Sequence, residues 1–521
     1  MLNLEIRIGS PGNLLAAAFF VAVAIVWVFV WAPRRNAALL SMPFLAVMAA
    51  CAAIWTAWGY GGLDEPEHLH CAYLVSRGLL PFRDFWQHHS PLIWLFLAGL
   101  MRWLDGSPWV FEIVRVIWTG VFVLIGLLGW AIARRTWRQR ADGVVYLVVF
   151  LGGGVLWQFC VGRPDLLEVL FMVAALYFCL HVAEGRWWAC LCCGAALSFA
   201  VTCTYKQLPL VVVPPIVILS RLPGRRAGLL AVYVAGLVLG VLPLASYLAH
   251  NGLLRDYVDW VLRFNRSVAF VSASFPLGVA VAGVVGWWYL LRWRLALQVS
   301  RAMVLLLAWP ICALASMPNT GATMYYYLNL WLVLGAVTSA GLPARDWLRR
   351  FAGRRAVLSV VAGALLAILT LPSLYSARQA VIGPRPFSHA ELARLIALCR
   401  NDTCLVLLPH HPIFCLDATR LYSTWQYEYA KDFDQVRQDL AGLATDVLKR
   451  KPALITHDVS TLMGIDKGDE LFHDMLKRGL ITQADYDRIQ VMLSADYTIE
   501  EIGGWRYYVR NDRAGRNVRG S

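Results

Sequence analysis

Residues 59–91 read GYGGLDEPEHLHCAYLVSRGLLPFRDFWQHHSP. This stretch gathers carboxylate, guanidinium and imidazole side chains between segments that are almost wholly apolar. The chain as a whole is 59% hydrophobic and only 15% charged, so the concentration is local. A membrane protein places ionisable groups at the bilayer interface or in a water-filled cavity, where they cost less free energy than in hydrocarbon. The stretch therefore predicts an acidic loop outside the membrane that carries a functional site.

The segments around this loop are long and apolar. Runs of about 20 apolar residues, the length that crosses the hydrocarbon core as a helix, recur through residues 1–375. We count about 12 such runs and predict a polytopic α-helical membrane protein. The net charge of +14 comes largely from Lys and Arg in short loops between the runs, which is the positive-inside pattern. The charge therefore does not indicate a nucleic-acid partner.

The basic loops also predict the orientation of the chain. Arg134 and Arg135 close the third apolar run, and such loops lie in the cytoplasm. Alternation of the runs then puts the 59–91 loop outside, together with the segment before the fifth run. We therefore predict that Asp64 and Asp165 lie on the same outer face.

A known family shares the order of features in the acidic loop. An apolar helix, then Asp64-Glu65, then an aromatic and basic stretch leading to His89-Ser90-Pro91-Leu92, resembles the first extracytoplasmic loop of the GT-C membrane glycosyltransferases. Within that group it is most similar to the branch of the protein O-mannosyltransferases and the lipid A aminoarabinose transferase. The likeness covers roughly residues 37–375. It implies a GT-C-like fold with an outer groove for a polyprenyl-phosphate-linked sugar.

The resemblance also implies roles for individual residues. By position, Asp64 matches the carboxylate thought to act as base on the acceptor, and Glu65 matches its partner. Asp165 resembles a second acidic position that faces the same cavity. Lys206 resembles a lysine thought to contact the donor phosphate, and a lysine snorkelling to the headgroups is the other interpretation.

Further side chains on the predicted outer face suit the same chemistry. Tyr325 and Tyr326 lie where the family has an aromatic stretch beside the donor cavity, although tyrosines at the start of a span also form interfacial belts. The sequence also allows a divalent metal ion, held by Asp64 and Asp165, as a cofactor. The cations that can compensate the phosphate charge, besides Lys206, are Arg83, Arg163, His88 and His89.

These observations predict an inverting glycosyltransferase that moves a sugar from a polyprenyl-phosphate donor to a glycan, lipid or protein acceptor. The lipid bilayer is the other partner, and we expect a bacterial inner membrane with the active site facing the periplasm. A transporter or flippase is the competing class, but transporters place ionisable groups within broken helices. A non-catalytic subunit with the same fold is a third interpretation. Asp64 with Glu67 also has the spacing of a helix capping box.

The composition changes from about Pro384, and residues 376–521 predict a small extracytoplasmic α/β domain. Strands are expected at 404–408 and 453–456, and helices at 389–398, 433–451 and 466–477. A hairpin is expected with Gly503-Gly504 in its turn. Two of the three cysteines Cys399, Cys404 and Cys415 could pair if the compartment is oxidising.

Overall fold

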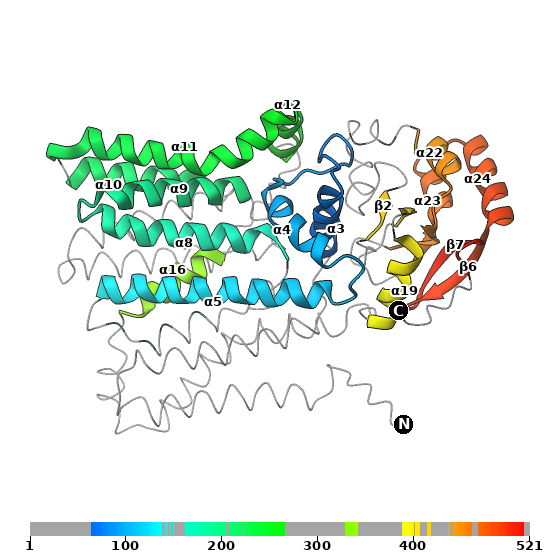
Figure 1. Cartoon of the computed structure of the whole chain (residues 1–521), viewed down its shortest axis with the longest axis horizontal. Coiled ribbons are helices and arrows are strands. Elements are labelled where there is room, and N and C mark those ends of the chain that lie inside the picture. Colours follow the sequence, from blue (N-terminus) through cyan, green and yellow to red (C-terminus); the bar gives the residue numbers. More distant parts are fainter. Residues whose placement is uncertain are drawn as a thin grey trace, which may run out of the picture. The chain divides into compact units, whose positions relative to one another are not determined.

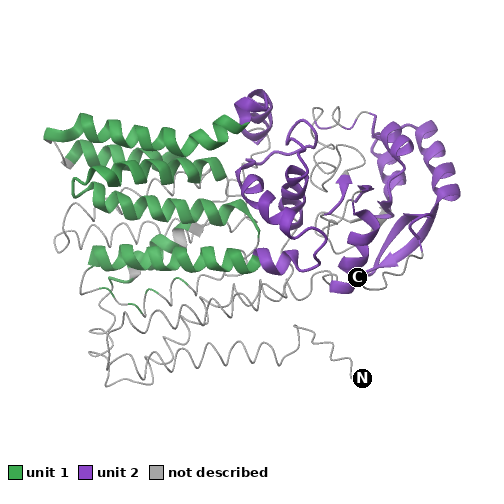
Figure 2. Ribbon diagram, in the orientation of Figure 1, with its two compact units in different colours: residues 1–58, 115–247, 267–381 green, residues 59–114, 248–266, 382–521 purple. Residues whose placement is uncertain are grey.

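The computed structural model describes residues 64–137, 162–204, 208–221, 223–265, 329–341, 388–400, 402–406, 414–417, 442–460 and 467–514, with a few single residues between them (Figure 1). The chain forms two compact units, each assembled from three separate segments (Figure 2). Unit 1 comprises residues 1–58, 115–247 and 267–381. Unit 2 comprises residues 59–114, 248–266 and 382–521.

Unit 1 is helical where the structure describes it. Three of its helices are long and apolar enough to cross a membrane: α5 (Val110–Trp137), α8 (Pro164–Val182) and α11 (Arg226–His250). Shorter apolar helices accompany them, and these are α9 (Trp187–Cys203), η3 (Leu208–Val212), α10 (Val213–Arg221) and α16 (Asn329–Ser339), with a single turn, η4 (Pro223–Arg225), between α10 and α11.

The apolar runs of the sequence predict spans at 109–133, 166–182, 187–203 and 229–248, with a short seventh span at 208–220. Helices lie at the first four of these positions. The predicted short seventh span, 208–220, is a 3-10 turn followed by a nine-residue helix. The predicted spans at 13–32, 37–58, 143–160, 303–316 and 356–374, and the one ending at residue 292, lie wholly or largely outside the described residues.

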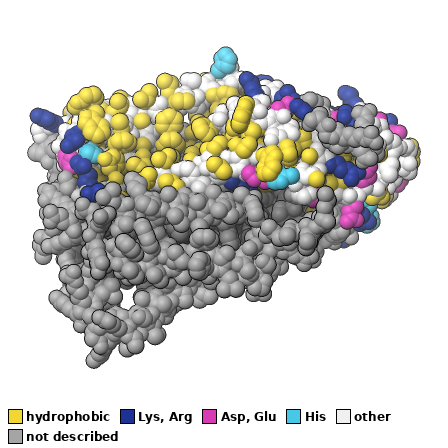
Figure 3. All heavy atoms as spheres, turned by 60° about the horizontal axis from the view of Figure 1, so that its bottom comes forward, with side chains coloured by type: hydrophobic (Ala, Val, Ile, Leu, Met, Phe, Trp, Pro, Cys, Tyr) yellow, Lys and Arg dark blue, Asp and Glu magenta, His cyan; other side chains and the backbone are white. Residues whose placement is uncertain are grey.

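Helix α11 exposes one hydrophobic face. Val234, Val238 and Leu242, which follow one another at four-residue intervals, are 52%, 59% and 52% exposed. Figure 3 shows hydrophobic side chains gathered over the helices of unit 1, with Lys and Arg side chains at one end. An apolar face of this kind on a membrane-length helix is suited to contact with lipid.

The face of α11 that packs against α9 depends on small residues. A Cβ atom added to Gly236 would collide with the carbonyl oxygen of Leu191 on α9, and one added to Gly194 would collide with that of Tyr233. The backbones of α9 and α11 therefore approach as closely as only glycine permits. Ser198 adds a hydrogen bond from its hydroxyl to the carbonyl of Leu237 (2.6 Å).

Unit 2 begins with the acidic stretch, and much of it is helical rather than a loop. Helix α3 spans Asp64–Ser76, and residues 77–91 connect it to α4 (Leu92–Trp103). Pro66 is tolerated because it lies in the first turn, where its missing N–H has no intrahelical acceptor. The carboxylates of the first turn also face the positive end of the helix dipole.

The apolar residues 92–104 are too few to span a membrane and predict an interfacial helix with Trp94 and Trp103 at the level of the headgroups. Helix α4 lies at this position, but its two tryptophans differ in exposure. Trp103 is 76% exposed, whereas Trp94 is fully buried in unit 2. Apolar residues at helical spacing after α11 predict an amphipathic helix, and the structure has a helix there, as α12 (Leu254–Tyr257) and a π-helix, η5 (Val258–Phe264).

The remainder of unit 2 contains the predicted α/β fold. Its five-stranded sheet has the order β2-β1-β3-β7-β6, parallel from β2 to β3 and antiparallel from β3 to β6. These strands are β1 (Thr403–Leu405), β2 (Leu416–Asp417), β3 (Leu454–Thr456), β6 (Tyr497–Ile502) and β7 (Trp505–Arg510). A separate antiparallel pair is formed by β4 (Asp458–Ser460) and β5 (Lys467–Glu470). The helices are α19 (His389–Cys399), α22 (Leu443–Arg450), α23 (Leu471–Lys477) and α24 (Gln483–Asp496).

The β6–β7 hairpin is confirmed, with Gly503 and Gly504 at φ 62° and 80° in its turn. Two expectations were wrong in part. Residues 467–470 form a strand instead of helix, and α24 was not predicted although Thr482 and Asp485 form its capping box.

No disulfide joins any two of Cys399, Cys404 and Cys415. They are buried in one hydrophobic cluster. Burial raises the pKa of the Cys399 thiol, which keeps it protonated.

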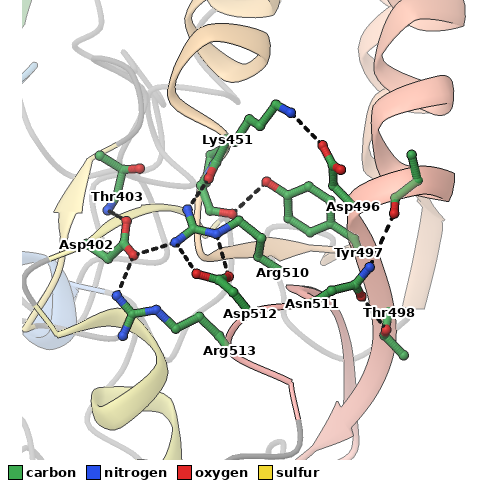
Figure 4. A network of polar contacts seen from close by, with 12 residues as sticks. Asp402, Thr403, Lys451, Asp496, Tyr497, Thr498, Arg510, Asn511, Asp512 and Arg513 are labelled. Atoms are coloured by element: carbon green, nitrogen blue, oxygen red, sulfur yellow. Dashed lines mark hydrogen bonds and ion pairs between the residues drawn. The ribbon is translucent and has the colours of Figure 1, made fainter.

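Polar contacts close the end of the sheet (Figure 4). The Arg510 guanidinium donates to Asp402 Oδ2 (2.9 Å), and Arg513 donates to the same oxygen (2.8 Å). Arg510 also donates to the carbonyl of Lys451 and to Asp512. These bonds tie the end of β7 to the turn before β1.

Candidate functional site

Helix α3 carries an unusual number of buried ionisable side chains. Glu65, Glu67, His68 and His70 are each between 0% and 4% exposed. Burying such groups is costly unless hydrogen bonds compensate. Asp64 is the first residue of the helix, and its side chain lies outside the described part of the structure.

Gln87, in the connection after α3, supplies part of this compensation. Its Nε2 donates to Glu67 Oε1 (2.8 Å), while its Oε1 accepts from the backbone N–H groups of His88 (2.7 Å) and His89 (3.1 Å). Backbone N–H groups can only donate, so they determine which end of the amide is oxygen. The Gln87 side chain is therefore held in one orientation.

This orientation determines the tautomer of His89. Its Nδ1 lies 2.9 Å from Gln87 Oε1. The amide oxygen can only accept, so Nδ1 carries the proton and donates. In the neutral ring, Nε2 of His89 then bears the lone pair.

His68 is held in the opposite tautomer. The indole Nε1–H of Trp94 donates to Nδ1 of His68 (3.1 Å). Indole is a donor only, so Nδ1 of His68 bears the lone pair and its Nε2 carries the proton. The two rings lie edge to face, with centroids 5.0 Å apart. The two rings therefore differ at Nδ1, which donates in His89 and accepts in His68.

The π-helix η5 closes one side of this cluster. Trp260 and Phe264 contact the Trp86 ring at 5.8 and 5.9 Å between centroids, and Phe264 also contacts His88 at 5.8 Å. Asn265, which follows η5, donates to the carbonyl of His88 (2.6 Å). Single π-helical turns often occur at functional sites.

Arg83 lies on the surface of the same connection. Its guanidinium pairs with Asp84 at 3.5 Å, and its side chain is 55% exposed. Asp84 in turn accepts from the backbone N–H of Leu80 (2.7 Å). The arginine is therefore accessible to an anionic ligand.

The second predicted acidic position belongs to unit 1. Asp165 lies in the first turn of α8, 5% exposed, and accepts from Arg163 Nε (3.1 Å). Trp118 on α5 donates to the carbonyl of Arg163 (2.9 Å), which holds the arginine backbone in place. Glu168, one turn further along α8, is also buried. The predicted proximity of Asp165 to Asp64 and Glu65 stays a prediction, because those residues belong to unit 2.

Three predicted site residues, Lys206, Tyr325 and Tyr326, lie outside the described residues. Within the described residues, no group of three or more His, Cys, Asp or Glu side chains is placed to hold a metal ion. Asp165, one of the two proposed ligands, is engaged by Arg163. The pairing of Asp64 with Asp165 around a metal ion stays a prediction, because the Asp64 side chain lies outside the described residues.

Sequence reasoning missed Gln87, Trp94 and Glu168 as parts of these clusters. Gln87 and Glu67 are 20 residues apart, and Trp94 and His68 are 26 apart. No local spacing brings such pairs together. The signal in the sequence is the uncharged polar Gln87 between the aromatic rings of Trp86 and His88.

The chain matches no protein-family model and no curated protein. Two structures of the Archaeoglobus fulgidus oligosaccharyltransferase are similar to it. The first, a complex with Zn and sulfate, has a TM-score of 0.39 and 14% identity, and covers 68% of this chain. This chain spans 55% of that structure's length. The second is AglB in complex with an inhibitory peptide and a dolichol-phosphate, with a TM-score of 0.45 and 13% identity. The match covers 90% of this chain and 74% of the AglB chain.

Proposed function

We propose that the chain is an inverting glycosyltransferase that moves a sugar from a polyprenyl-phosphate donor to a glycan, lipid or protein acceptor on the periplasmic face of a bacterial inner membrane. The observation that supports this most is the buried cluster after Asp64, in which Glu67, Gln87, His68 and His89 are held by directed hydrogen bonds. A stretch needed only for solubility has no reason to bury these groups.

The reaction requires a base, and Asp64 or Glu65 supplies it in this proposal. The acceptor hydroxyl attacks the anomeric carbon, and the carboxylate takes the hydroxyl proton. The bond between the anomeric carbon and the phosphate oxygen breaks, and its electron pair leaves with the polyprenyl phosphate. A single displacement of this kind inverts the anomeric configuration.

The leaving phosphate requires compensation of its negative charge. Arg83, Arg163, Lys206 and the histidines at 88 and 89 are the cations that we assign to this role. Asp165 orients Arg163 through their 3.1 Å contact. No step of the proposal uses a metal ion.

The polyprenyl tail requires an apolar surface. Exposed faces such as that of α11, with Val234, Val238 and Leu242, provide this kind of surface in unit 1. Tyr325 and Tyr326 are proposed to border the donor cavity.

The test is transfer of radiolabelled sugar from polyprenyl-phosphate-sugar pools in membranes that contain the wild type, Asp64→Asn or Asp84→Asn at equal abundance. We expect the transfer rate of Asp64→Asn to be about a hundredfold or more below that of the wild type, since a positioned general base accelerates a reaction by that factor. Asp84→Asn removes an exposed carboxylate from the same stretch and should stay near wild type.

Equal activity of the wild type and Asp64→Asn would remove Asp64 from the role of base. A parallel Glu65→Gln variant then decides whether its neighbour has that role. Absence of product from the wild type with every donor would contradict glycosyl transfer and favour a transporter or a non-catalytic subunit.

A further inference from the structure

We propose that residues 254–264, the docking segment, bind an anionic phospholipid surface. The apolar side chains on the outer face of the segment enter the lipid interface, and its arginines bind the lipid phosphates. The docking segment comprises α12 and η5 and follows the membrane-length helix α11. Lipid docking is a separate property from the proposed transfer of sugar, and it is tested without an assay of transfer.

The inner face of the docking segment already packs within unit 2. Trp260, Val261 and Phe264 are buried. The rings of Trp260 and Phe264 meet the Trp86 ring at 5.8 and 5.9 Å between centroids. These contacts hold the segment in the fold, so the apolar side chains on its other face are not needed for packing.

The outer face of the docking segment carries a line of apolar side chains. Leu254, Val258 and Leu262 follow one another at four-residue intervals and are 51%, 37% and 41% exposed. Residues four apart lie on the same face of a helix, so the three side chains form one stripe. Single exposed hydrophobic residues need no explanation, whereas a contiguous exposed apolar surface marks contact with a partner or a membrane.

A charged stripe runs beside the apolar one. Arg255, Asp259 and Arg263 are also four residues apart, and Asp259 pairs with Arg263 at 2.5 Å and with Arg255 at 3.7 Å. The two arginine side chains are 92% and 75% exposed, whereas that of Asp259 is 25% exposed. Asp256, the other carboxylate of the segment, is partly buried. The outermost charges are therefore positive, and guanidinium groups suit phosphate oxygens as partners.

The position of the docking segment in the chain favours lipid over a protein partner. Helix α11 ends at His250, and the backbone closes it at once: Gly252 takes φ 69°, and the N–H of Leu253 donates to the carbonyl of Leu248 (2.8 Å). Leu254, the first residue of the segment, follows directly. Four residues of extended chain cover at most about 14 Å, so the segment begins close to the end of α11. The end of a membrane-spanning helix lies at the membrane surface.

Other exposed hydrophobic side chains of unit 2 show a similar distribution. In the described part of the unit, the large hydrophobic side chains that are exposed are Phe96, Trp103, Trp109, Leu254, Val258, Leu262, Val491 and Ile499. The first three precede α5, and the next three follow α11. Exposed apolar surface therefore gathers beside the ends of two membrane-length helices, where lipid contact places it.

The test measures amide hydrogen exchange of the docking segment in the full-length chain in lipid nanodiscs. One set of nanodiscs contains phosphatidylcholine alone, and the other contains phosphatidylglycerol as well. The variants are Val258→Asp and the double substitution Arg255→Gln with Arg263→Gln. Their matched controls on α24 are Val491→Asp and Arg488→Gln, which change an exposed valine and an exposed arginine. The melting temperature of each variant reports whether it is folded.

The arginines account for the preference for anionic lipid. In the wild type, exchange in the docking segment should be slower with phosphatidylglycerol than without it, by about fivefold for each arginine at the surface. The double variant should exchange at the same rate in both lipids, whereas Arg488→Gln should keep the wild-type difference. Equal rates for the wild type in the two lipids, or a double variant that keeps the difference, would contradict the proposal.

The apolar stripe contributes binding that does not depend on lipid charge. Val258→Asp should make exchange in the docking segment at least about threefold faster in both lipids, because it places a carboxylate in the lipid interface. Valine and aspartate have similar helix propensities, so the same change on a face in water is nearly neutral. Val491→Asp should leave exchange in the docking segment unchanged. A folded Val258→Asp variant with wild-type exchange overturns lipid docking.

Photo-crosslinking identifies what covers the stripe. A photoreactive amino acid is placed at position 258, or at position 491 as the control, and the membranes that contain the chain are irradiated. We expect a lipid adduct at position 258 in excess over position 491. A protein adduct at position 258, including one with a second copy of the chain, would show a protein interface. Absence of an adduct, or equal lipid adducts at both positions, would show a face in water. Each of these results overturns the proposal.

Discussion

Asp458 is a buried carboxylate held by two neighbours. Arg506 donates to it through two nitrogens, one at 3.0 Å, and His457 Nδ1 lies 2.8 Å from Oδ1. Burial raises the pKa of Asp458, but the bonds from Arg506 and His457 outweigh it, so the pKa lies below its usual value. The charged carboxylate therefore stabilises the folded state at neutral pH.

Asp458→Asn should lower the free energy of unfolding by about 1–3 kcal/mol at pH 7, the usual contribution of hydrogen bonds to a charged group. Because the folded pKa is depressed, the wild-type advantage is complete above the unfolded pKa near 4 and is lost as pH falls below it. Thermal unfolding of the full-length chain in detergent at pH 7, 4 and 3 measures this.

Asp487→Asn is the control for Asp458→Asn, because it neutralises an exposed carboxylate of the same unit. A difference between wild type and Asp458→Asn that did not shrink at pH 3 would show that shape, and not charge, is what Asp458 contributes.

At the scale of elements, the α9–α11 contact depends on the absence of side chains. A methyl group at Gly236 would meet the backbone carbonyl of Leu191, which cannot move aside as a flexible side chain can. Gly236→Ala should therefore separate the helices and destabilise the chain by about 1–3 kcal/mol. The measurement is the melting temperature in nanodiscs.

Gly228→Ala is the matched substitution on the same helix, because nothing lies within 4 Å of a Cβ atom there. It should leave the stability unchanged or raise it by up to about 1 kcal/mol, through helix propensity. Equal effects at both glycines would mean that propensity rather than close approach decides the outcome.

At the scale of the molecule, unit 2 joins segments that are distant in the chain. Arg400, after α19, donates to Asp105 after α4 (3.0 Å), and His389 contacts Glu112 on α5 (2.8 Å). The rings of Tyr73 and Phe414 also meet, at 5.4 Å between centroids. These contacts hold the α/β part against the helices that follow the acidic stretch.

Arg400→Glu places a like charge opposite Asp105, and we expect faster amide hydrogen exchange in both α19 and α4. The change should be modest, on the order of 1 kcal/mol, because the pair is partly exposed. Arg394→Glu removes a pairing with Glu500 inside the α/β part, so it should accelerate exchange in α19 and leave α4 unaffected. Unchanged exchange in α4 of Arg400→Glu would contradict the proposed coupling.

Local patterns in the sequence were enough for several elements. Apolar runs near membrane length predicted the helices α5, α8 and α11. The pair Gly503-Gly504 predicted the β-hairpin, since both glycines take positive φ in its turn. Helix α24 was not predicted, because its apolar residues show only weak helical periodicity. The capping-box residues Thr482 and Asp485 are nevertheless recognisable in the sequence.

The sequence by itself determined where charge is concentrated and which segments are apolar, because composition and short-range spacing carry that information. The tertiary structure decided that Gln87 meets Glu67, that Trp94 is buried against His68, and that Cys399, Cys404 and Cys415 share one hydrophobic core. Each of these depends on contacts between residues that are far apart in the chain or on different elements. Such contacts arise when elements pack, and the proton positions of His68 and His89 follow from that packing.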